Sequence, residues 1–159
     1  MAQIIVRPAK REELERVNEL RRMVNDVHVA GRPAHFRPGF DESLRSHVYE
    51  QFDQPERFGV LVGLVDGEVA GFATVQYVHR PEGPYTHALD FYHVEEFGVD
   101  AAFRRRGVAS ALVRYMKDDA KARGLGRIDL DVWGFNGDAL AFYEAAGFTT
   151  YRRYMELEV

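Results

Sequence analysis

The hydrophobic residues of this chain recur with two different periods, which divide the sequence into predicted helices and strands. Apolar positions three or four residues apart predict helices over residues 14–27, 44–52, 109–120 and 138–146. β-branched and aromatic runs predict strands over residues 3–7, 58–65, 69–78, 88–99, 128–133 and 148–159. The order β-α-α-β-β-β-α-β-α-β indicates a mixed sheet with helices on its faces, in an α/β or α+β architecture.

Turn and capping residues lie between these segments. Asp66 and Gly67 form a two-residue hairpin signal, and Asp41 is a predicted cap for the second helix. Gly124 and Gly147 are expected to end the third and fourth helices. A length of 159 residues suits one domain, so we expect a single domain over residues 1–159.

The composition narrows the classes of function. The chain has no cysteine, which excludes disulfides, thiolate metal sites and a cysteine nucleophile within this sequence. The six histidines show no metal-ligand spacing, so no metal site is expected. A formal net charge of −4 argues against a nucleic-acid partner. No apolar run approaches the length of a membrane span and no secretory signal is visible, so we expect a cytoplasmic protein without a membrane partner.

The stretch Val99 to Ala111, VDAAFRRRGVASA, combines a strand end, an arginine- and glycine-containing turn and a helix start. Such a turn presents backbone N–H groups to an anion, and the helix dipole strengthens the attraction. Gly107 and Ala109 are small enough to let a phosphate approach the backbone. The P-loop and dinucleotide glycine patterns are absent. Considered alone, the stretch fits an ordinary strand-to-helix turn with solvated arginines equally well.

A second stretch, Asn136 to Phe148 with the sequence NGDALAFYEAAGF, decides between these interpretations. The first stretch resembles the [Q/R]-x-x-G-x-[G/A] motif of the GCN5-related N-acetyltransferase (GNAT) superfamily, and the second resembles its N-x-x-A-x-x-[F/L]-Y-x-x-x-G-F motif. The matching positions are Arg104, Gly107 and Ala109, followed by Asn136, Ala139, Phe142, Tyr143, Gly147 and Phe148. The resemblance covers nearly the whole chain. It implies a mostly antiparallel central sheet with a splayed parallel strand pair and helices on both faces.

The resemblance also implies acetyl-CoA as cosubstrate, with the pyrophosphate on the arginine turn and the pantetheine arm between strands 94–99 and 128–133. Asn136 is either a ligand of the arm or a plain helix cap. The residues expected to bind acetyl-CoA are Phe97, Val99, Arg104, Arg105, Arg106, Gly107, Val108, Ala109, Ser110, Asn136 and Tyr143.

Acetyl transfer to an amine needs an acid for the departing thiolate and a base for the ammonium. The resemblance makes Tyr143 the candidate acid, and a buried aromatic on an apolar helix face is its alternative interpretation. Some family members carry a glutamate base on the strand before the turn, where this chain has Glu95 and Glu96. Only one of two neighbouring strand residues faces the acceptor. Counting along the strand favours Glu95, a bulge would favour Glu96, and a solvated or ion-paired role is the alternative for both.

The expected activity is N-acetylation of a primary amine by direct attack in a ternary complex. The segments expected to shape the acceptor pocket are residues 27–40 and 77–85, and Asp90, Glu95 and Glu96 would supply a negative field for a cationic amine. An acyl-CoA-binding sensor without turnover is the alternative of a different class. The fold allows a homodimer, but the sequence shows no seam for one.

Overall fold

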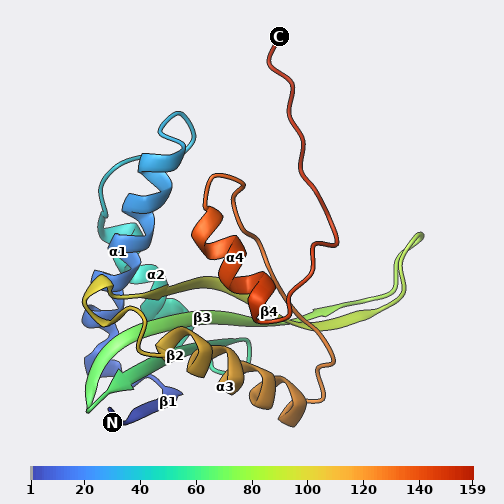
Figure 1. Ribbon diagram of the computed structural model, residues 1–159. Helices are drawn as coiled ribbons and strands as arrows, with labels where there is room; N and C mark the ends of the chain where they lie inside the picture. Colours follow the sequence, from blue (N-terminus) through green and yellow to red (C-terminus); the bar gives the residue numbers. More distant parts are fainter. Residues whose placement is uncertain (1) are drawn as a thin grey trace.

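The computed structural model describes residues 2–159 and places eleven elements along the chain. They are β1 (Ile4–Pro8), the 3-10 turn η1 (Arg11–Glu13), α1 (Leu14–Gly31), α2 (Glu42–Phe52), β2 (Phe58–Val65), β3 (Glu68–Arg80), β4 (Leu89–Val99), the 3-10 turn η2 (Ala101–Phe103), α3 (Val108–Ala122), β5 (Ile128–Leu130) and α4 (Gly137–Ala145). Figure 1 shows their arrangement. The predicted order of helices and strands is confirmed up to α4.

The five strands form one sheet in the order β1-β2-β3-β4-β5. Neighbouring strands from β1 to β4 are antiparallel, whereas β4 and β5 are parallel. The β4–β5 pairing covers only Tyr92–Val94 on one side and Ile128–Leu130 on the other. Beyond these residues β4 continues to Val99 without β5 beside it. The predicted splayed parallel pair is therefore present in a mostly antiparallel sheet.

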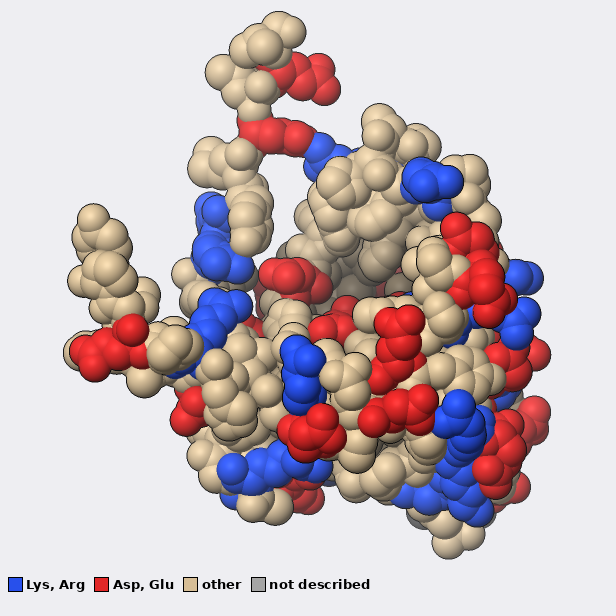
Figure 2. Space-filling model, turned by 180° about the vertical axis from the view of Figure 1, so that it is seen from behind, with Lys and Arg blue, Asp and Glu red and all other residues tan. Residues whose placement is uncertain are grey.

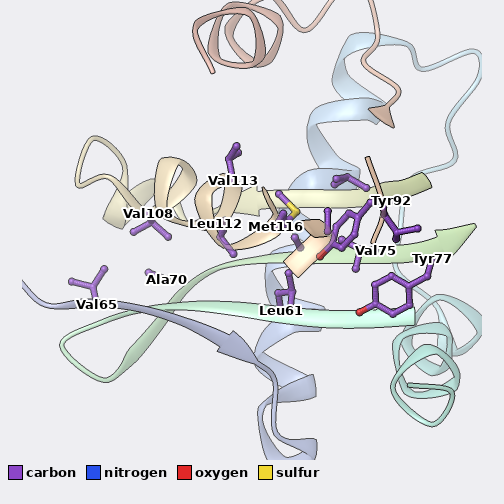
Figure 3. Packing of buried hydrophobic residues seen from close by; sticks show 14 residues of the cluster. Leu61, Val65, Ala70, Val75, Tyr77, Tyr92, Val108, Leu112, Val113 and Met116 are labelled. Atoms are coloured by element: carbon purple, nitrogen blue, oxygen red, sulfur yellow. The ribbon is translucent and has the colours of Figure 1, made fainter. Parts of the chain in front are cut away.

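Alternating side chains of the strands fill two separate cores, one on each face of the sheet. On one face, the apolar side of α3 packs on the strands through Val108, Leu112, Val113 and Met116 (Figure 3). On the other face, Leu14, Val17 and Leu20 of α1 and Val48 of α2 cover Val60, Val62 and Phe72. Helices on both faces of the sheet are confirmed. The helical period gives each helix one apolar face, and the strand period gives the sheet two apolar faces for these helices to cover.

Local signals in the sequence also act as expected. The Asp41 side chain accepts a hydrogen bond from the Leu44 backbone N–H and caps α2. Asp66 and Gly67 both have positive φ, at 49° and 85°, as a tight hairpin between β2 and β3 requires. In the residues that the structure describes, no helix is long and apolar enough to cross a membrane.

Two strand predictions are wrong at the C-terminal end. The strand expected over residues 128–133 ends at Leu130, because β4 pairs with only three of its residues. The strand expected over residues 148–159 is absent from the described chain, and this segment leaves the body after α4 (Figure 1). A strand needs hydrogen-bonded neighbours, and the pattern of a segment alone does not supply them.

Candidate functional site

The turn between β4 and α3 is held in an unusual backbone conformation. Asp100 follows β4, accepts a hydrogen bond from the Ala102 backbone N–H, and forms an ion pair of 2.8 Å with Arg16 of α1. The Ala102 N–H and then the Arg16 guanidinium hold the pKa of Asp100 below its ordinary value. Further along, Arg105 and Gly107 adopt positive φ values of 62° and 86°. Gly107 is followed directly by the helical residue Val108, and such a left-handed and right-handed pair turns neighbouring N–H groups toward one side, as in anion-binding nests.

The helix α3 begins at this turn with Gly107 as its N-cap, and no side chain of the described residues caps it. Its first N–H groups and the positive end of its dipole are therefore available to an anion. A cavity of about 290 Å³ opens at this helix start. It is lined by Val99, Phe103, Arg104, Arg105, Gly107, Val108, Ala109, Ser110 and Phe142. Most residues predicted to bind acetyl-CoA therefore share one cavity.

Four predicted ligands lie outside that lining. Arg106 places its guanidinium over the Phe103 ring, 5.5 Å from the ring centre. Phe97 stacks on Phe142, a cavity residue, with 6.0 Å between ring centres. Tyr143 lies next to the same pair, 6.0 Å from Phe97 and 5.6 Å from Phe142. Phe97 and Tyr143 thus lie next to the cavity residue Phe142, and Phe97 is on the part of β4 beyond its pairing with β5.

Asn136 caps α4, since its Oδ1 accepts a hydrogen bond from the Ala139 N–H at 3.4 Å. The structure therefore shows Asn136 as a helix cap through its side-chain oxygen. The amide nitrogen takes no part in this hydrogen bond. Contact between Asn136 and a pantetheine arm stays a prediction.

Burial controls the chemistry of Tyr143. Desolvation raises the pKa of its phenol from 10.0 to about 12. A phenol with this pKa remains protonated throughout the neutral range, so it keeps a proton to donate. Its position beside Phe97 places that donor at the splayed end of β4.

The two glutamates of β4 lie at a β-bulge. Thr74 of β3 is opposite Glu96, but the next residue, Val75, is opposite Val94, so Glu95 is the extra residue. Val94 and Phe97 both pack toward the α3 core, although they are an odd number of residues apart. The bulge therefore turns both glutamates toward the α1 and α2 face. The expectation that neighbouring residues 95 and 96 point to opposite faces is wrong, and the bulge does not by itself favour Glu96 over Glu95.

The neighbours of the two carboxylates differ in charge. Glu96 forms an ion pair of 2.9 Å with Arg21 of α1, whose side chain is only 3% exposed. Glu95 accepts a hydrogen bond of 2.6 Å from the neutral amide of Gln51 on α2. Glu95 is exposed, whereas Glu96 is partly buried. Glu96 is thus paired with a buried cation, whereas Glu95 is exposed and has no charged partner among these contacts.

A third polar group lies on the same strand, where β4 and β5 still pair. His93 and Asp129 are opposite each other in the register, with 2.7 Å between Nδ1 and Oδ1. The Tyr151 hydroxyl donates to the other oxygen of Asp129 at 2.9 Å. Residues 93 and 95 are two positions apart on the strand, so their side chains point to the same face of the sheet. The face of β4 that carries Glu95 therefore also carries His93.

Aromatic side chains form a wall across the splayed strands. His28, His35 and Phe36 from the end of α1 and its following loop meet Trp133 and Phe135 from the loop after β5, with ring centres 4.8 to 6.2 Å apart. Burial lowers the pKa of His28, against the opposing charge of Glu96, so its ring is neutral at pH 7. The expected role of residues 27–40 in the acceptor region is consistent with this wall.

The sequence pattern did not indicate Trp133 and Phe135 as residues of the acceptor region, although Trp133 is the one tryptophan of the sequence. Gly31 admits Phe135 to the end of α1, because a Cβ there would lie 2.2 Å from the ring. The segment 77–85 was assigned wrongly to this region. Tyr77 packs against Tyr92 in the core beneath α3, and the β3–β4 connection reaches away from the body (Figure 1).

The surface on this side is hollowed between the C-terminal segment and the main body, and acidic side chains lie at its margin (Figure 2). Asp90 pairs instead with His79 at 2.8 Å in an exposed contact between β3 and β4. A second cavity, of about 330 Å³, lies against Tyr77, Tyr115 and Arg123, away from the turn at 104–110. Among residues 2–159, no three acidic or histidine side chains are grouped as metal ligands.

Comparisons with known proteins agree with this geometry. The model of the acetyltransferase (GNAT) family matches residues 19–148. The L-amino acid N-acetyltransferase AaaT of Escherichia coli is 38% identical over 92 residues, which are 55% of this chain and 51% of that protein. The [ribosomal protein bS18]-alanine N-acetyltransferase of Escherichia coli is 30% identical over 121 residues, covering 76% of this chain and 70% of that protein. The chain spans about half the length of the first curated relatives that it matches.

Solved structures show the same fold. A point mutant of the BH1408 protein from Bacillus halodurans has a TM-score of 0.91 at 27% identity, covering 98% of this chain and 99% of that one. The aminoglycoside N-acetyltransferase AAC(6')-Iy in complex with CoA has a TM-score of 0.78 at 19% identity, covering 100% and 96% of the two chains. The family match spans most of the chain and includes both the arginine turn and the helix of Tyr143. The chain therefore belongs to the acetyltransferase (GNAT) family.

Proposed function

We propose that this chain, as a single acetyltransferase domain, transfers the acetyl group of acetyl-CoA to a primary amine by direct attack in a ternary complex. The observation that carries the proposal is the cavity at the uncapped start of α3, lined by Arg104, Arg105 and the small residues Gly107, Ala109 and Ser110. Positive charge, outward N–H groups and little side-chain bulk are what a pyrophosphate needs. The cosubstrate supplies the thioester, and the residues of the chain bind it and move the protons.

The splayed strands place the reacting groups. Phe97 and Val99, on the free edge of β4, are the proposed backbone partners of the pantetheine arm, because β5 ends at Leu130 and leaves this edge without a pairing strand among the described residues. The α3 turn lies at one end of this edge, and the bulge with Glu95 lies toward the other. The amine approaches from the α1 and α2 face, where Glu95 is exposed.

Proton movements follow from two side chains. Glu95 takes a proton from the ammonium form of the amine, whose nitrogen then bonds to the acetyl carbonyl carbon while the carbon–sulfur bond breaks. Tyr143 donates its proton to the departing sulfur, because its raised pKa keeps the phenol protonated. As the amide forms, its nitrogen loses a second proton to solvent, Tyr143 regains a proton from solvent, and Glu95 releases the proton that it took. The balance is one amide, free CoA and one proton released to solvent. The absence of cysteine means that no acetyl-cysteine intermediate forms on these 159 residues.

The acceptor class is an amine, and the relatives differ in which amine their names state. They are named for L-amino acids and for the alanine of a ribosomal protein, and a fold neighbour is named for aminoglycosides. The acidic margin and the aromatic wall of this chain suit a cationic amine with apolar carbon around it. A homodimer is part of this proposal. The cytoplasmic location and the lack of nucleic-acid and membrane partners stay predictions from the sequence.

A panel of amino acids, peptides with free N-termini, polyamines and aminoglycosides, with release of free CoA as the readout, tests the proposal. We expect turnover with at least one class. Acetyl-CoA at about 100 times its dissociation constant should also stabilise the fold by roughly 2.7 kcal/mol. Binding without turnover across the panel would favour the sensor alternative, which the transferase names of the relatives do not support. No binding would contradict both.

A further inference from the structure

Two buried polar atoms without a hydrogen-bond partner belong to residues beside the bulge in β4. Among residues 2–159, the buried side-chain atoms in this position are Gln51 Oε1 on α2 and Thr74 Oγ1 on β3. Thr74 lies opposite Glu96 at the register shift, and Gln51 is bonded to Glu95, the extra residue of the bulge. A buried polar atom without a partner costs stability. Such local conflicts gather at functional sites, so their concentration here points to a function of the bulge.

Gln51 occupies a place on α2 that suits an apolar side chain. It is 1% exposed and comes three residues after Val48, which packs in the core between the helices and the sheet. Methionine is as long and unbranched as glutamine, so it would fill this place without leaving an oxygen unpaired. The packing of α2 therefore does not explain a glutamine at position 51.

The amide nitrogen of Gln51 does have a partner. Nε2 donates to Glu95 Oε2 over 2.6 Å, and the bond runs from an almost fully buried side chain to an exposed one. Because Glu95 is the extra residue of the bulge, no residue of β3 lies opposite it to fix its place. The bond to Gln51 supplies that fixed point. It uses one oxygen of the carboxylate and leaves the other, Glu95 Oε1, outside the bond.

The neutrality of this donor matters for an acceptor that arrives as an ammonium ion. A cationic partner, such as Arg21 for Glu96, would neutralise the carboxylate and repel the ammonium group. An amide orients the carboxylate through a dipole and brings no net charge beside it. The two glutamates of the bulge thus have the partners that their different roles require.

We propose that Gln51 is a positioning residue for Glu95, whose carboxylate it holds by one oxygen so that the other faces the amine. The inference rests on Glu95 being the base of the proposed function. The unpaired oxygen of Gln51 follows from this role. With Nε2 fixed on Glu95, the amide oxygen lies in the packed interior, where residues 2–159 offer it no donor.

The first test replaces Gln51 in the full chain with methionine and uses Thr74→Val as the matched control. Both changes remove a buried unpaired oxygen beside the bulge, but only Gln51 has a hydrogen bond to Glu95. We expect both variants to melt at or above the temperature of the parent chain in circular dichroism. Gln51→Met should lower kcat by about tenfold and leave the amine KM and the acetyl-CoA dissociation constant within about twofold. Thr74→Val should keep the kcat of the parent chain.

A double-mutant cycle separates positioning from a general disturbance of the site. In a chain that carries Glu95→Gln, the further change Gln51→Met should alter kcat by less than about twofold, because no base remains to be positioned. A tenfold loss that persists in this background would overturn the proposal, and so would an unchanged kcat in Gln51→Met alone. A melting temperature of Gln51→Met well below that of the parent chain would also overturn it, by showing that Gln51 stabilises the fold.

Nuclear magnetic resonance tests the contact without any substrate. A strong hydrogen bond to a carboxylate should move one side-chain N–H proton of Gln51 downfield, and Glu95→Ala should reverse this shift. The amide of Gln54, which donates to the Glu50 backbone carbonyl, is the control and should not respond. A Gln51 signal that ignores Glu95→Ala would contradict the proposal.

The outcomes distinguish this inference from the proposed function. A parent-like kcat in Glu95→Gln means that the base of the proposed function is wrong. A loss of kcat in Glu95→Gln without one in Gln51→Met is a failure of the positioning role alone. The melting and resonance measurements need no turnover, so they decide the contact and its cost in stability whatever the amine panel shows.

Discussion

Arg21 and Glu96 form an ion pair of 2.9 Å in which the arginine is almost fully buried beneath α2. The same guanidinium donates to Asn18 Oδ1 at 2.8 Å and to the Leu44 backbone carbonyl, so Arg21 joins α1, the start of α2 and β4. Glu96 supplies the only negative charge among these partners. Glu96 is therefore a structural residue, and its neighbour Glu95 remains the candidate base.

Replacement of the structural carboxylate is expected to destabilise the fold. Glu96→Gln leaves a buried guanidinium without its counter-ion, and we expect a loss of about 2 kcal/mol in the free energy of unfolding, because Glu96 itself remains partly exposed. Urea denaturation followed by circular dichroism measures this loss. A stability equal to that of the parent chain would contradict the structural assignment of Glu96.

Replacement of the neighbouring carboxylate is expected to affect catalysis instead. Glu95 is exposed and bonded to a neutral amide, so Glu95→Gln should change the unfolding free energy by less than about 0.5 kcal/mol. The loss of a general base should lower kcat by about 100-fold or more near neutral pH. Steady-state kinetics with the best amine of the panel measures this change. If Glu96→Gln lowers kcat as much after correction for folded protein, the division of roles is wrong.

Removal of the Tyr143 hydroxyl tests the acid. Tyr143→Phe keeps the aromatic contacts with Phe97 and Phe142 and removes the proton donor. We expect kcat to fall by about 100-fold while the acetyl-CoA dissociation constant stays nearly unchanged. Isothermal titration calorimetry and steady-state kinetics separate the two quantities. An equal loss in affinity would mean that the phenol mainly binds the cosubstrate.

Alkaline pH should reveal the buried state of the same residue. The pKa of Tyr143 is raised from 10.0 to about 12 in the folded chain. A raised pKa means that its contribution to stability is fully present below about pH 10 and is lost as pH rises through about 12. The parent chain should therefore lose unfolding free energy more steeply over this range than Tyr143→Phe. Tyr77 and Tyr92 also have raised pKa values, but they titrate in both proteins and cancel in the comparison.

The left-handed glycine at the start of α3 has a matched control at the other end of the helix. Gly107 and Gly124 have φ values of 86° and 71°, and a Cβ at either position meets no atom closer than 3.6 Å. Alanine at each should cost about 1 kcal/mol of stability through backbone strain. Only Gly107→Ala should also weaken acetyl-CoA binding, by about tenfold, because Gly107 lines the cavity. Thermal melts and calorimetry on both variants measure these effects. Equal acetyl-CoA affinities would place the phosphate elsewhere.

Much of the fold could be predicted from local pattern. The apolar stripe of α3 begins immediately after the arginine turn, and the same turn lines the cavity. Asp41 caps α2 and Asp66-Gly67 turns the hairpin, because side-chain capping and positive φ depend on the residue itself. The family motifs around Gly107 and Tyr143 likewise lie on contiguous stretches, so the sequence alone was sufficient to find them.

Properties that depend on a partner strand were decided only by the tertiary structure. The bulge at Glu95 exists because β3 and β4 pair with a one-residue shift, and no pattern within β4 reveals the register of β3. The length of β5 and the fate of residues 148–159 depend on which edges are covered. The sequence by itself determined the helices, turns and motifs, since their causes lie within a few residues. The tertiary structure decided which glutamate binds Arg21 and which strand remains unpaired, since hydrogen bonding and burial join residues that are far apart in the chain.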